Sequence, residues 1–521
     1  MARAEHRFDV LILGGGTAGC VLAARLSEDG SCSVCLVEAG PDYGPHEEGG
    51  WPKEMLDARA VPKTHDWGLD DDVSLLRARI VGGCSAHNAC FVVWGAREDY
   101  DEWSDRGAGW TFASLEPYLR RAEAELRTRE LASEELSAWH HAARAAAVRL
   151  GFPRLGSFND LDADEGVAPI PLNAVGDVRW STAFAYLDSA RGRGNLELVA
   201  DAQVDRVVLE GDRAVGAIAH TADGERELLA ARVVLAAGAY GSPAILMRSG
   251  IGPADQLRQL GIELRLDRPG VGANLVDHSG VNVFFQPNER LTEKLRGQVQ
   301  RGLLFQGQCA IRARTSVCPE GLWDLHLLPW ASQIGAWPGL LPEGIIEGDF
   351  ETHITVFAMK PASRGRVRLR SADPAALPLV EQHFLSDHEG RDLATILAGV
   401  ERVRELAAAP ELAELISQEV FPGPSVLGRD ALATWAREAV RGYFHPVGTC
   451  AMGPAGDECA VVDECGAVHG IENLHVVDAS VMPTIPRANT NLATVAIAER
   501  LAEELAAPQS SGVRRRARVH P

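Results

Sequence analysis

The sequence predicts an α/β fold organised around a parallel sheet, and three features of its N-terminal region predict it. Residues 8–13 form an uninterrupted apolar run, which is typical of a buried parallel strand. Three glycines spaced as G-x-G-x-x-G follow at once, and residues 18–26 then carry apolar side chains at helical spacing. A second apolar run ends in Glu38. A strand, a glycine turn, a helix and a strand ending in an acid are the order of a dinucleotide-binding βαβ unit.

Each residue of this unit has its own expected task. Gly14 permits the tight turn, Gly16 lets the backbone approach a pyrophosphate, and Gly19 lets the helix and strand pack closely. The helix N-terminus then presents unpaired N–H groups to the anion. Glu38, 24 residues after Gly14, is expected to accept hydrogen bonds from ribose hydroxyls. The alternative is a structural glycine turn that holds no ligand.

The composition describes a large globular protein with an acidic surface. The 521 residues suffice for two or more domains, and 46% of them are hydrophobic. A formal net charge of −21 argues against a nucleic-acid partner, and it fits either a cationic substrate or simple solubility. No run of about 18 apolar residues occurs, so no membrane span is expected.

Cysteine usage predicts a reducing compartment. Ten cysteines are too few for a disulfide scaffold in a chain of this length. Residues 1–7 lack the apolar stretch of a signal peptide, so we expect a cytoplasmic protein. Cys32 and Cys35 form a C-x-x-C pair, but they lie at the start of a strand, without the helix N-terminus that lowers a thiol pKa. We therefore do not expect redox chemistry from this pair.

The region after the first βαβ unit alternates between irregular and helical stretches. Residues 41–72 are rich in Pro, Gly, Asp and His, and we expect an irregular excursion from the sheet. Residues 111–150 have helical spacing, and Gly151 is expected to end the helix. Residues 151–180 have the composition of a loop.

The second half of the chain contains strands, a change of character and a final helix. Residues 196–238 predict a strand meander that ends in a buried parallel strand over 233–238. Residues 281–440 change to longer loops with scattered Trp and Pro, and they mark a candidate second domain. We expect a terminal helix over 490–506 and a disordered basic tail over 507–521.

Six further blocks complete the pattern. They are 81–85 (VGGCS), 236–243 (AAGAYGSP), 268–278 (RPGVGANLVDH), 445–449 (HPVGT), 477–483 (VDASVMP) and 489–491 (NTN). With these blocks in this order, the chain resembles the glucose–methanol–choline (GMC) oxidoreductase family of FAD-dependent alcohol oxidases and dehydrogenases over residues 7–505. Asparagine at position 489 is similar to the subgroup of choline oxidase and hydroxymethylfurfural oxidase.

The resemblance implies the architecture of the whole chain. It implies an α/β (α+β overall) fold, in which a Rossmann-like FAD-binding domain on a parallel sheet joins a substrate-binding domain of antiparallel sheet and helices. Both domains are then discontinuous in sequence. The implied FAD-binding domain comprises 7–155, 196–280 and 440–506, and the implied substrate-binding domain comprises 156–195 and 281–439.

The resemblance also implies that His445 and Asn489 form a polar pair that faces the flavin. Oxidising an alcohol to a carbonyl removes a hydroxyl proton, which a base must take, and a carbon-bound hydride, which flavin accepts. Imidazole suits the first task because its ordinary pKa of about 6.5 leaves it mostly neutral at pH 7. An amide can hold the same oxygen by donating a hydrogen bond. The alternatives are a core histidine and a helix cap. The implied cofactor-binding residues are Gly14, Gly16, Gly19, Glu38, Gly83, His87, Asn88, Ala89, Val204, Asp478, Ala479 and Asn491.

His87 raises a separate question about the cofactor. Its segment resembles the one whose histidine is covalently joined to the flavin in choline oxidase, and most family members have no histidine there. A covalent bond would withdraw electrons from the flavin and favour hydride uptake. The alternative is a histidine that lines the flavin pocket without a bond. Ala89 stands where choline oxidase has serine, which removes a hydroxyl from the active-site side.

The substrate is expected to be a small-molecule alcohol, with electrons passed to oxygen or a quinone-type acceptor. Choline is doubtful because residues 306–309 carry no acid to hold a trimethylammonium group, and because Phe444 replaces the tyrosine of choline oxidase. The sequence therefore leaves the alcohol open. Four residues that either shape the pocket or pack in the core are Trp323, His326, Trp330 and Trp337.

Three other functions compete with alcohol oxidation. A hydroxynitrile lyase with structural FAD would also use His445 and Asn489 to move protons, but it has no need of a flavin bond at His87. A nicotinamide–disulfide reductase would need a second G-x-G-x-x-G in mid-chain, and none occurs. A non-catalytic flavin-binding protein would have no use for the polar pair.

Overall fold

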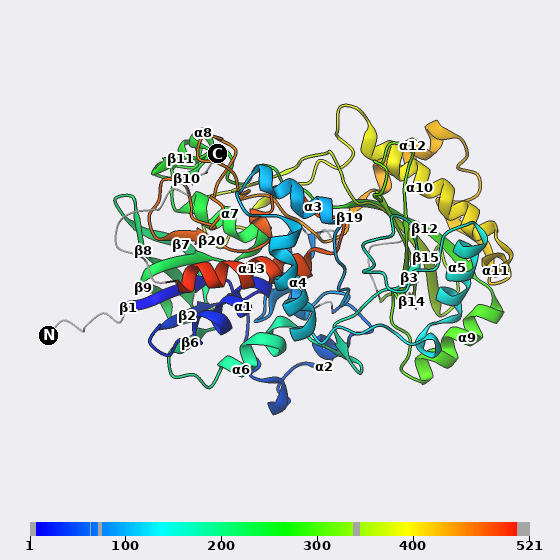
Figure 1. The fold of residues 1–521 in the computed structure, drawn as a ribbon, viewed down its shortest axis with the longest axis horizontal. Helices are drawn as coiled ribbons and strands as arrows, with labels where there is room; N and C mark the ends of the chain where they lie inside the picture. The colour runs from blue at the N-terminus through cyan, green and yellow to red at the C-terminus, as the bar shows by residue number, and fades with distance from the viewer. Residues whose placement is uncertain (1–6, 63, 71–74, 337–343, 508–521) are drawn as a thin grey trace, which may run out of the picture.

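The computed structural model has two halves, each built on one seven-stranded sheet (Figure 1). The parallel sheet and its helices form one half, and an antiparallel sheet forms the other. The tail beyond residue 507 and Trp337 lie outside the described residues. The structure describes residues 7–62, 64–70, 75–336 and 344–507.

The first sheet contains the predicted parallel core. Its strands are β1 (Arg7–Leu13), β2 (Val34–Val37), β6 (Leu196–Val199), β7 (Gln203–Glu210), β8 (Arg213–Thr221), β9 (Gly224–Leu235) and β20 (Leu474–Val476). β1 pairs in parallel with β2 on one side and β9 on the other, β6 extends the sheet beyond β2, and β20 pairs with β9. β7 and β8 add an antiparallel ribbon. The carboxyl ends of β1, β2 and β9 therefore meet at one edge.

β9 differs from the prediction, which separated the parallel strand over 233–238 from the meander before it. The structure has one continuous strand whose first part pairs antiparallel with β8 and whose residues 229–235 pair in parallel with β1. Residues 224–227 are exposed and residues 233–235 are buried. No glycine or proline falls between 225 and 235 to break the strand, so it passes from surface ribbon to core without a turn.

Helices stack over the parallel sheet in layers (Figure 1). They are α1 (Thr17–Leu26), α4 (Phe112–Glu125), α7 (Gly238–Arg248) and α13 (Thr490–Ala506). α1 packs against α13, and α13 packs against α4. The bounds of α13 confirm the terminal helix predicted over 490–506. Segments from both ends of the sequence thus cover the same face of the sheet.

The stretch 111–150, predicted from its helical spacing, forms two helices with a break between them. The structure has α4 and a separate α5 (Ala138–Arg149), because each has its own N-cap: the side chain of Thr111 accepts from Ser114 N, and that of Ser137 accepts from His140 N. α4 packs on α13, whereas α5 packs on the other half of the molecule. The chain therefore crosses between the halves over residues 126–137.

The second sheet is antiparallel throughout, including its edge strands. Its strands are β3 (Gly166–Pro169), β12 (Ser279–Pro287), β13 (Cys309–Ala313), β14 (Leu325–Gln333), β15 (Phe350–Ala358), β18 (Ile416–Phe421) and β19 (Arg441–Gly442). β3 corrects the prediction of a loop over 151–180, since it forms an edge strand antiparallel to β13. The apolar pattern there was too short to separate from loop sequence.

Helices cover one face of the antiparallel sheet (Figure 1). Besides α5 they are α9 (Glu289–Gln300), α10 (Arg391–Ala408), α11 (Pro410–Ala413) and α12 (Arg429–Ala439). The remaining short elements are α2 (Lys53–Leu56), α3 (Arg97–Asp101), α6 (Asp188–Ala190), α8 (Ala254–Gln259), β4 (Ala174–Val175), β5 (Val178–Arg179), β10 (Ile251–Gly252), β11 (Leu266–Asp267), β16 (Arg366–Arg368) and β17 (Leu379–Glu381).

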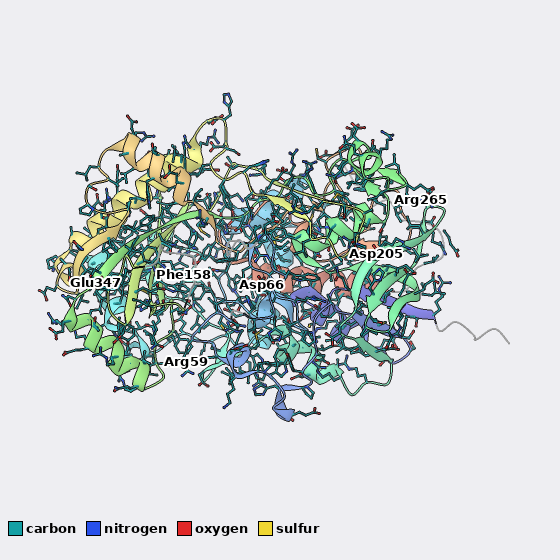
Figure 2. The ribbon with its side chains drawn as sticks, turned by 180° about the vertical axis from the view of Figure 1, so that it is seen from behind. Arg59, Asp66, Phe158, Asp205, Arg265 and Glu347 are labelled. Carbon is teal, nitrogen blue, oxygen red and sulfur yellow. The ribbon has the colours of Figure 1, made fainter. Side chains whose placement is uncertain are left out.

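Labelled side chains mark the two halves in Figure 2, which views the molecule from behind. Asp205 and Arg265 lie in the half with the parallel sheet, Phe158 and Glu347 lie in the half with the antiparallel sheet, and Asp66 lies between them. Within the described ranges, no helix has the length and apolar character needed to cross a bilayer.

Candidate active site

A cavity of about 380 Å³ lies between the two sheets. One end is lined by the turn after β1, the end of β2 and the turn after β9, and the other end by side chains of β12, β14 and β15. This volume is within the range of small-molecule sites. The cavity lies at the carboxyl edge of the parallel strands, where open α/β sheets bind ligands.

The glycine turn forms one wall of the cavity, and its three glycines have separate structural reasons. Gly14 has a φ of +112°, and a Cβ there would lie 2.6 Å from the carbonyl oxygen of Ala236. A Cβ on Gly19 would lie 1.9 Å from the carbonyl oxygen of Gly14, so only glycine lets α1 pack this closely. A Cβ on Gly16 would meet nothing nearer than 3.8 Å. Gly16 therefore exposes bare backbone to the cavity.

Gly83 packs a second turn onto the first. It has a φ of +52°, and a Cβ there would lie 2.6 Å from Gly16 Cα. The backbone N–H of Gly82 donates to the carbonyl of Gly15 at 2.8 Å. The two glycine-rich segments thus make one continuous backbone surface on the cavity wall.

Glu38 lines the cavity, but both of its carboxylate oxygens already bind backbone. Oε2 accepts from Gly15 N at 2.8 Å and Oε1 accepts from Gly40 N at 3.0 Å. Burial raises the pKa of Glu38 to about 7, against the lowering effect of these bonds. Each carboxylate oxygen has a second lone pair. Glu38 therefore holds the glycine turn in place, and the predicted ribose contact stays a prediction.

His87 also lines the cavity, from the turn that follows Gly83. Its Nε2 is buried and has no hydrogen-bond partner within the described residues. Burial, and to a smaller extent the charge of nearby arginines, lowers the pKa of His87 to about 3. The ring is therefore neutral, and its buried Nε2 is left without a described partner. Asn88 and Ala89 lie beside it on the same wall.

The other predicted cofactor residues reach the cavity from three separate segments. Asp478 Oδ2 accepts from Gly238 N at 2.8 Å and from Ser242 Oγ at 2.6 Å, which ties the turn after β20 to the turn after β9. Asn491 Oδ1 accepts from Thr17 Oγ1, and its buried Nδ2 has no described partner. Further predicted residues that line the cavity are Val204 and Ala479. Gly19 alone among the predicted site residues lies behind the wall.

His445 and Asn489 meet at the cavity. Asn489 Nδ2 donates to His445 Nε2 at 3.0 Å, and each side chain is only 8% exposed. Asn489 is the N-cap residue of α13, yet its side chain makes no capping bond, because it points to the imidazole instead. Burial lowers the pKa of His445 well below its ordinary value, so the ring is a neutral base.

Asp277 fixes the backbone of the segment that carries His445. Its Oδ1 accepts from the backbone N–H of Tyr443 at 3.2 Å and from that of His445 at 2.9 Å. Burial raises the pKa of Asp277 to about 7. Sequence analysis assigned no role to Asp277; its place beside His278 in a family block was the available signal.

The far end of the cavity is aromatic with a few polar groups. The rings of Tyr443 and Phe357 stack at 3.5 Å between centroids, and Phe91 meets Trp330 edge to face. Thr355 Oγ1 donates to Asn282 Oδ1 at 2.7 Å. Other lining residues at this end are Leu328 and His353.

Of the four pocket candidates, Trp330 lines the cavity. Trp323 and His326 are buried elsewhere in the core: Arg312 lies over the Trp323 ring at 4.4 Å, and His326 packs edge to face on Phe158. Cys32 and Cys35 are free thiols before and within β2, and neither lines the cavity. The described residues contain no cluster of metal-ligating side chains.

Two family models of GMC oxidoreductase match this chain, over residues 8–280 and 361–498. The chain belongs to the GMC oxidoreductases. It is 34% identical to 5-(hydroxymethyl)furfural oxidase of Methylovorus sp., over 96% of this chain and 98% of that one. It is 32% identical to oxygen-dependent choline dehydrogenase of Pseudomonas savastanoi pv. phaseolicola, over 96% and 94%. Pyridoxine 4-oxidase from Mesorbium loti has a TM-score of 0.83 at 28% identity, covering 96% of this chain and 99% of that one.

This GMC oxidoreductase is an FAD-dependent alcohol oxidoreductase with a mixed α/β fold, as predicted. The named relatives are all oxidoreductases, and they give no support to the lyase alternative. The cavity wall fits the cofactor: bare backbone at Gly16 and unpartnered nitrogens of His87 and Asn491 are the groups that a buried dinucleotide would cover.

Proposed function

We propose that His445 is the base that takes the hydroxyl proton of the alcohol, and that Asn489 holds the alcohol oxygen. The observation that carries this proposal is the 3.0 Å contact between His445 Nε2 and Asn489 Nδ2 on the cavity wall. An alcohol beside this pair can donate its O–H to Nε2 and accept from Nδ2. FAD, when bound, supplies the acceptor for the carbon-bound hydride.

We place the cofactor along the wall that runs from the glycine turn to Asn491. The Gly14–Gly16 turn and the N-terminus of α1 would hold the pyrophosphate, and Glu38 and Val204 lie where the ribose and adenine would follow. The fold supports the predicted domain division with two changes. α5 packs on β14 and β3, and β19 pairs with β12, so we assign both to the substrate-binding domain.

We propose an uncharged aromatic primary alcohol as the substrate class. The far end of the cavity offers aromatic faces and the neutral polar groups of Asn282, Thr355 and His353. Among the described lining residues the carboxylates are Glu38 and Asp478, and both belong to the glycine-turn end. A quaternary ammonium group would therefore find aromatic rings but no described counter-charge, which disfavours choline. The name of the furfural oxidase relative supports the same class.

Anaerobic reduction of the purified protein tests the proposal. 5-(Hydroxymethyl)furfural and benzyl alcohol should bleach the flavin absorbance, and choline at the same concentration should bleach it far more slowly. Absence of bleaching by every alcohol would refute the function, and carbonyl release from a cyanohydrin would then support the lyase. Faster bleaching by choline would refute the substrate class alone.

We propose oxygen as the electron acceptor and the cytoplasm as the location. The relatives are named as oxidases or as oxygen-dependent, which supports the first. All ten cysteines are free thiols, which supports a reducing compartment. Peroxide formed in air should match alcohol consumed, whereas turnover only with an added dye or quinone would favour another acceptor. Cell fractionation tests the location.

A further inference from the structure

A second histidine, His278, lies directly behind His445. Its side chain is fully buried, with 0% exposure, and it immediately precedes β12. His278 Nδ1 lies 3.0 Å from His445 Nδ1, and His278 Nε2 lies 3.0 Å from the carbonyl oxygen of Pro486. The two rings meet edge to face at 89°. A line of hydrogen bonds thus runs from Pro486 through both imidazoles to Asn489.

This line allows only one arrangement of protons. The Pro486 carbonyl can only accept, so His278 Nε2 carries the hydrogen. A neutral imidazole has a single N–H, so His278 Nδ1 must accept, and the donor facing it is His445 Nδ1–H. His445 Nε2 then has no hydrogen and presents a lone pair. The other end of the line agrees independently, because Asn489 Nδ2 can only donate to that nitrogen.

His278 remains neutral, as the argument requires. Burial lowers its pKa to about 3, against the raising effect of the Pro486 and Met359 backbone, and its hydrogen-bond partners are an imidazole and backbone groups rather than a carboxylate. The titratable groups that face it are His445, Tyr443, His326 from β14, Asp99 from α3, and Lys360 after β15. Asp99 and Lys360 pair with each other, so their fields on the ring oppose.

We propose that His278 is a positioning residue that locks His445 in the Nδ1–H tautomer, so that Nε2 keeps the lone pair to which an alcohol O–H can donate once it takes the place of the Asn489 N–H. The tautomer assignment stands on the hydrogen bonds alone; its use in catalysis rests on the proposed function of His445. The same contact also steadies the protonated state, because His445 Nδ1–H continues to donate to His278 while Nε2 holds the proton. The proton then stops at His445, since the described partners of His278 beyond His445 are backbone groups of Pro486 and Met359, which cannot take one.

His278 also joins the two segments that supply the polar pair. The carbonyl of Pro486 accepts from His278 Nε2–H and from the backbone N–H of Ala488 at 2.7 Å. Asn489 follows in the same turn. One buried ring therefore sets the tautomer of His445 and anchors the loop that presents Asn489.

Replacement of His278 by asparagine and by leucine tests this role on the FAD-loaded protein. In His278→Asn the amide oxygen can take over as acceptor for His445 Nδ1–H, whereas His278→Leu offers none. We expect the flavin reduction rate with 5-(hydroxymethyl)furfural to fall on the order of 10²-fold in His278→Leu, and by less than about tenfold in His278→Asn. The acid limb of kcat/KM should move to lower pH only in the leucine variant, because protonated His445 loses its acceptor.

Nitrogen-15 NMR of histidine-labelled protein at pH 7.5 reads the tautomer directly. We expect the wild type and His278→Asn to show His445 Nε2 unprotonated, and His278→Leu to show a mixture of tautomers. A protonated Nε2 in the wild type, or an unchanged rate and acid limb in His278→Leu, would overturn the proposal. If the leucine variant fails to load FAD, the asparagine variant and the wild-type spectrum still decide. If the wild type oxidises no alcohol, the proposed function fails, and the NMR result on the tautomer stands separately.

Discussion

The two ends of the cavity are built from different materials. The nucleotide end is made of backbone: Gly14, Gly16 and Gly83 bring bare main chain to the wall, and Glu38 braces it through backbone N–H groups. The substrate end is made of side chains: His445, Asn489 and a set of aromatic rings from β14, β15 and the segments around Phe91 and Tyr443. Where backbone forms the wall, steric contact limits which residue types can occupy a position. Where side chains form the wall, each residue depends on the neighbours that contact it. The first constraint is local in sequence and the second is not.

Substitution of Gly19 should have the largest effect of the changes predicted here. A small effect would contradict the view that backbone packing determines the nucleotide end. In Gly19→Ala the new Cβ lies 1.9 Å from the Gly14 carbonyl, a backbone atom that cannot rotate away. We expect a loss of more than about 3 kcal/mol in the free energy of unfolding, at or beyond the usual range for overpacking. Denaturant titration measures it. The matched control is Gly16→Ala, whose Cβ has 3.8 Å of clearance, and which should fold normally and lose FAD affinity instead.

Substitution of His445, the proposed base at the substrate end, should leave the fold intact and remove most of the alcohol oxidation. His445→Ala should retain a yellow, folded protein and lose about 10²- to 10⁴-fold in alcohol turnover. That loss corresponds to roughly 3 to 5.5 kcal/mol of barrier. Stopped-flow flavin reduction and the flavin spectrum report the two properties separately. Near-normal turnover in a flavin-loaded variant would contradict the assigned role.

The pH dependence of kcat/KM tests the role of His445 without a mutation. Burial places the pKa of His445 well below 6.5, so the imidazole is already in its basic form at neutral pH. With an uncharged alcohol, kcat/KM should be flat above about pH 6.5 and should fall only as acid protonates the ring. A limb centred above pH 7 would show that a different group controls proton removal.

Substitution of His87 tests whether the flavin is bound covalently to this wall of the cavity. The predicted bond to flavin means that acid precipitation should leave the yellow colour in the wild-type pellet and release it in His87→Ala. The buried Nε2 of this neutral ring has no described partner, and it is the atom that we expect to carry the link. Free FAD in the wild-type supernatant would show that His87 only lines the pocket.

The smallest effect is expected at Glu38. Glu38→Gln keeps one acceptor oxygen but loses either the Gly15 or the Gly40 contact and the negative charge. We expect FAD affinity to fall by about tenfold, which corresponds to about 1.4 kcal/mol, and alcohol turnover of the loaded enzyme to be unchanged. Titration of the apoprotein with FAD measures it. Unchanged affinity would mean that Glu38 serves the turn alone.

The parts of the fold and site that could be predicted are those set by local sequence. The G-x-G-x-x-G turn, the parallel pairing of its strands and the terminal helix over 490–506 all have signals within a few residues of one another. Family blocks added His445 and Asn489, which the structure brings within 3.0 Å. The break between α4 and α5 was missed because helical periodicity continues on both sides of the Ser137 cap.

The supporting residues could not be predicted because their meaning depends on distant partners. His278 acquires its role only where His445 and Pro486 meet it, 167 and 208 residues further along the chain. The Tyr443–Phe357 stack likewise joins the segment after β19 to β15, and the Asn282–Thr355 bond joins β12 to β15. No spacing within one segment encodes such contacts. The substrate end of the cavity, which is formed by side chains, is therefore the part that only the three-dimensional structure reveals.

The covering of the first strands by the last segments has a consequence for biosynthesis. β20 and α13 are translated long after β1 and α1, yet β20 joins the sheet that contains β1, and α13 covers α1. A nascent chain that stops before residue 474 has the glycine turn but neither Asp478 nor Asn491 to close around a nucleotide. We therefore expect prosthetic-group uptake to wait until residues 474–491 have been synthesised, and products that end before residue 474 to accumulate as colourless apoprotein.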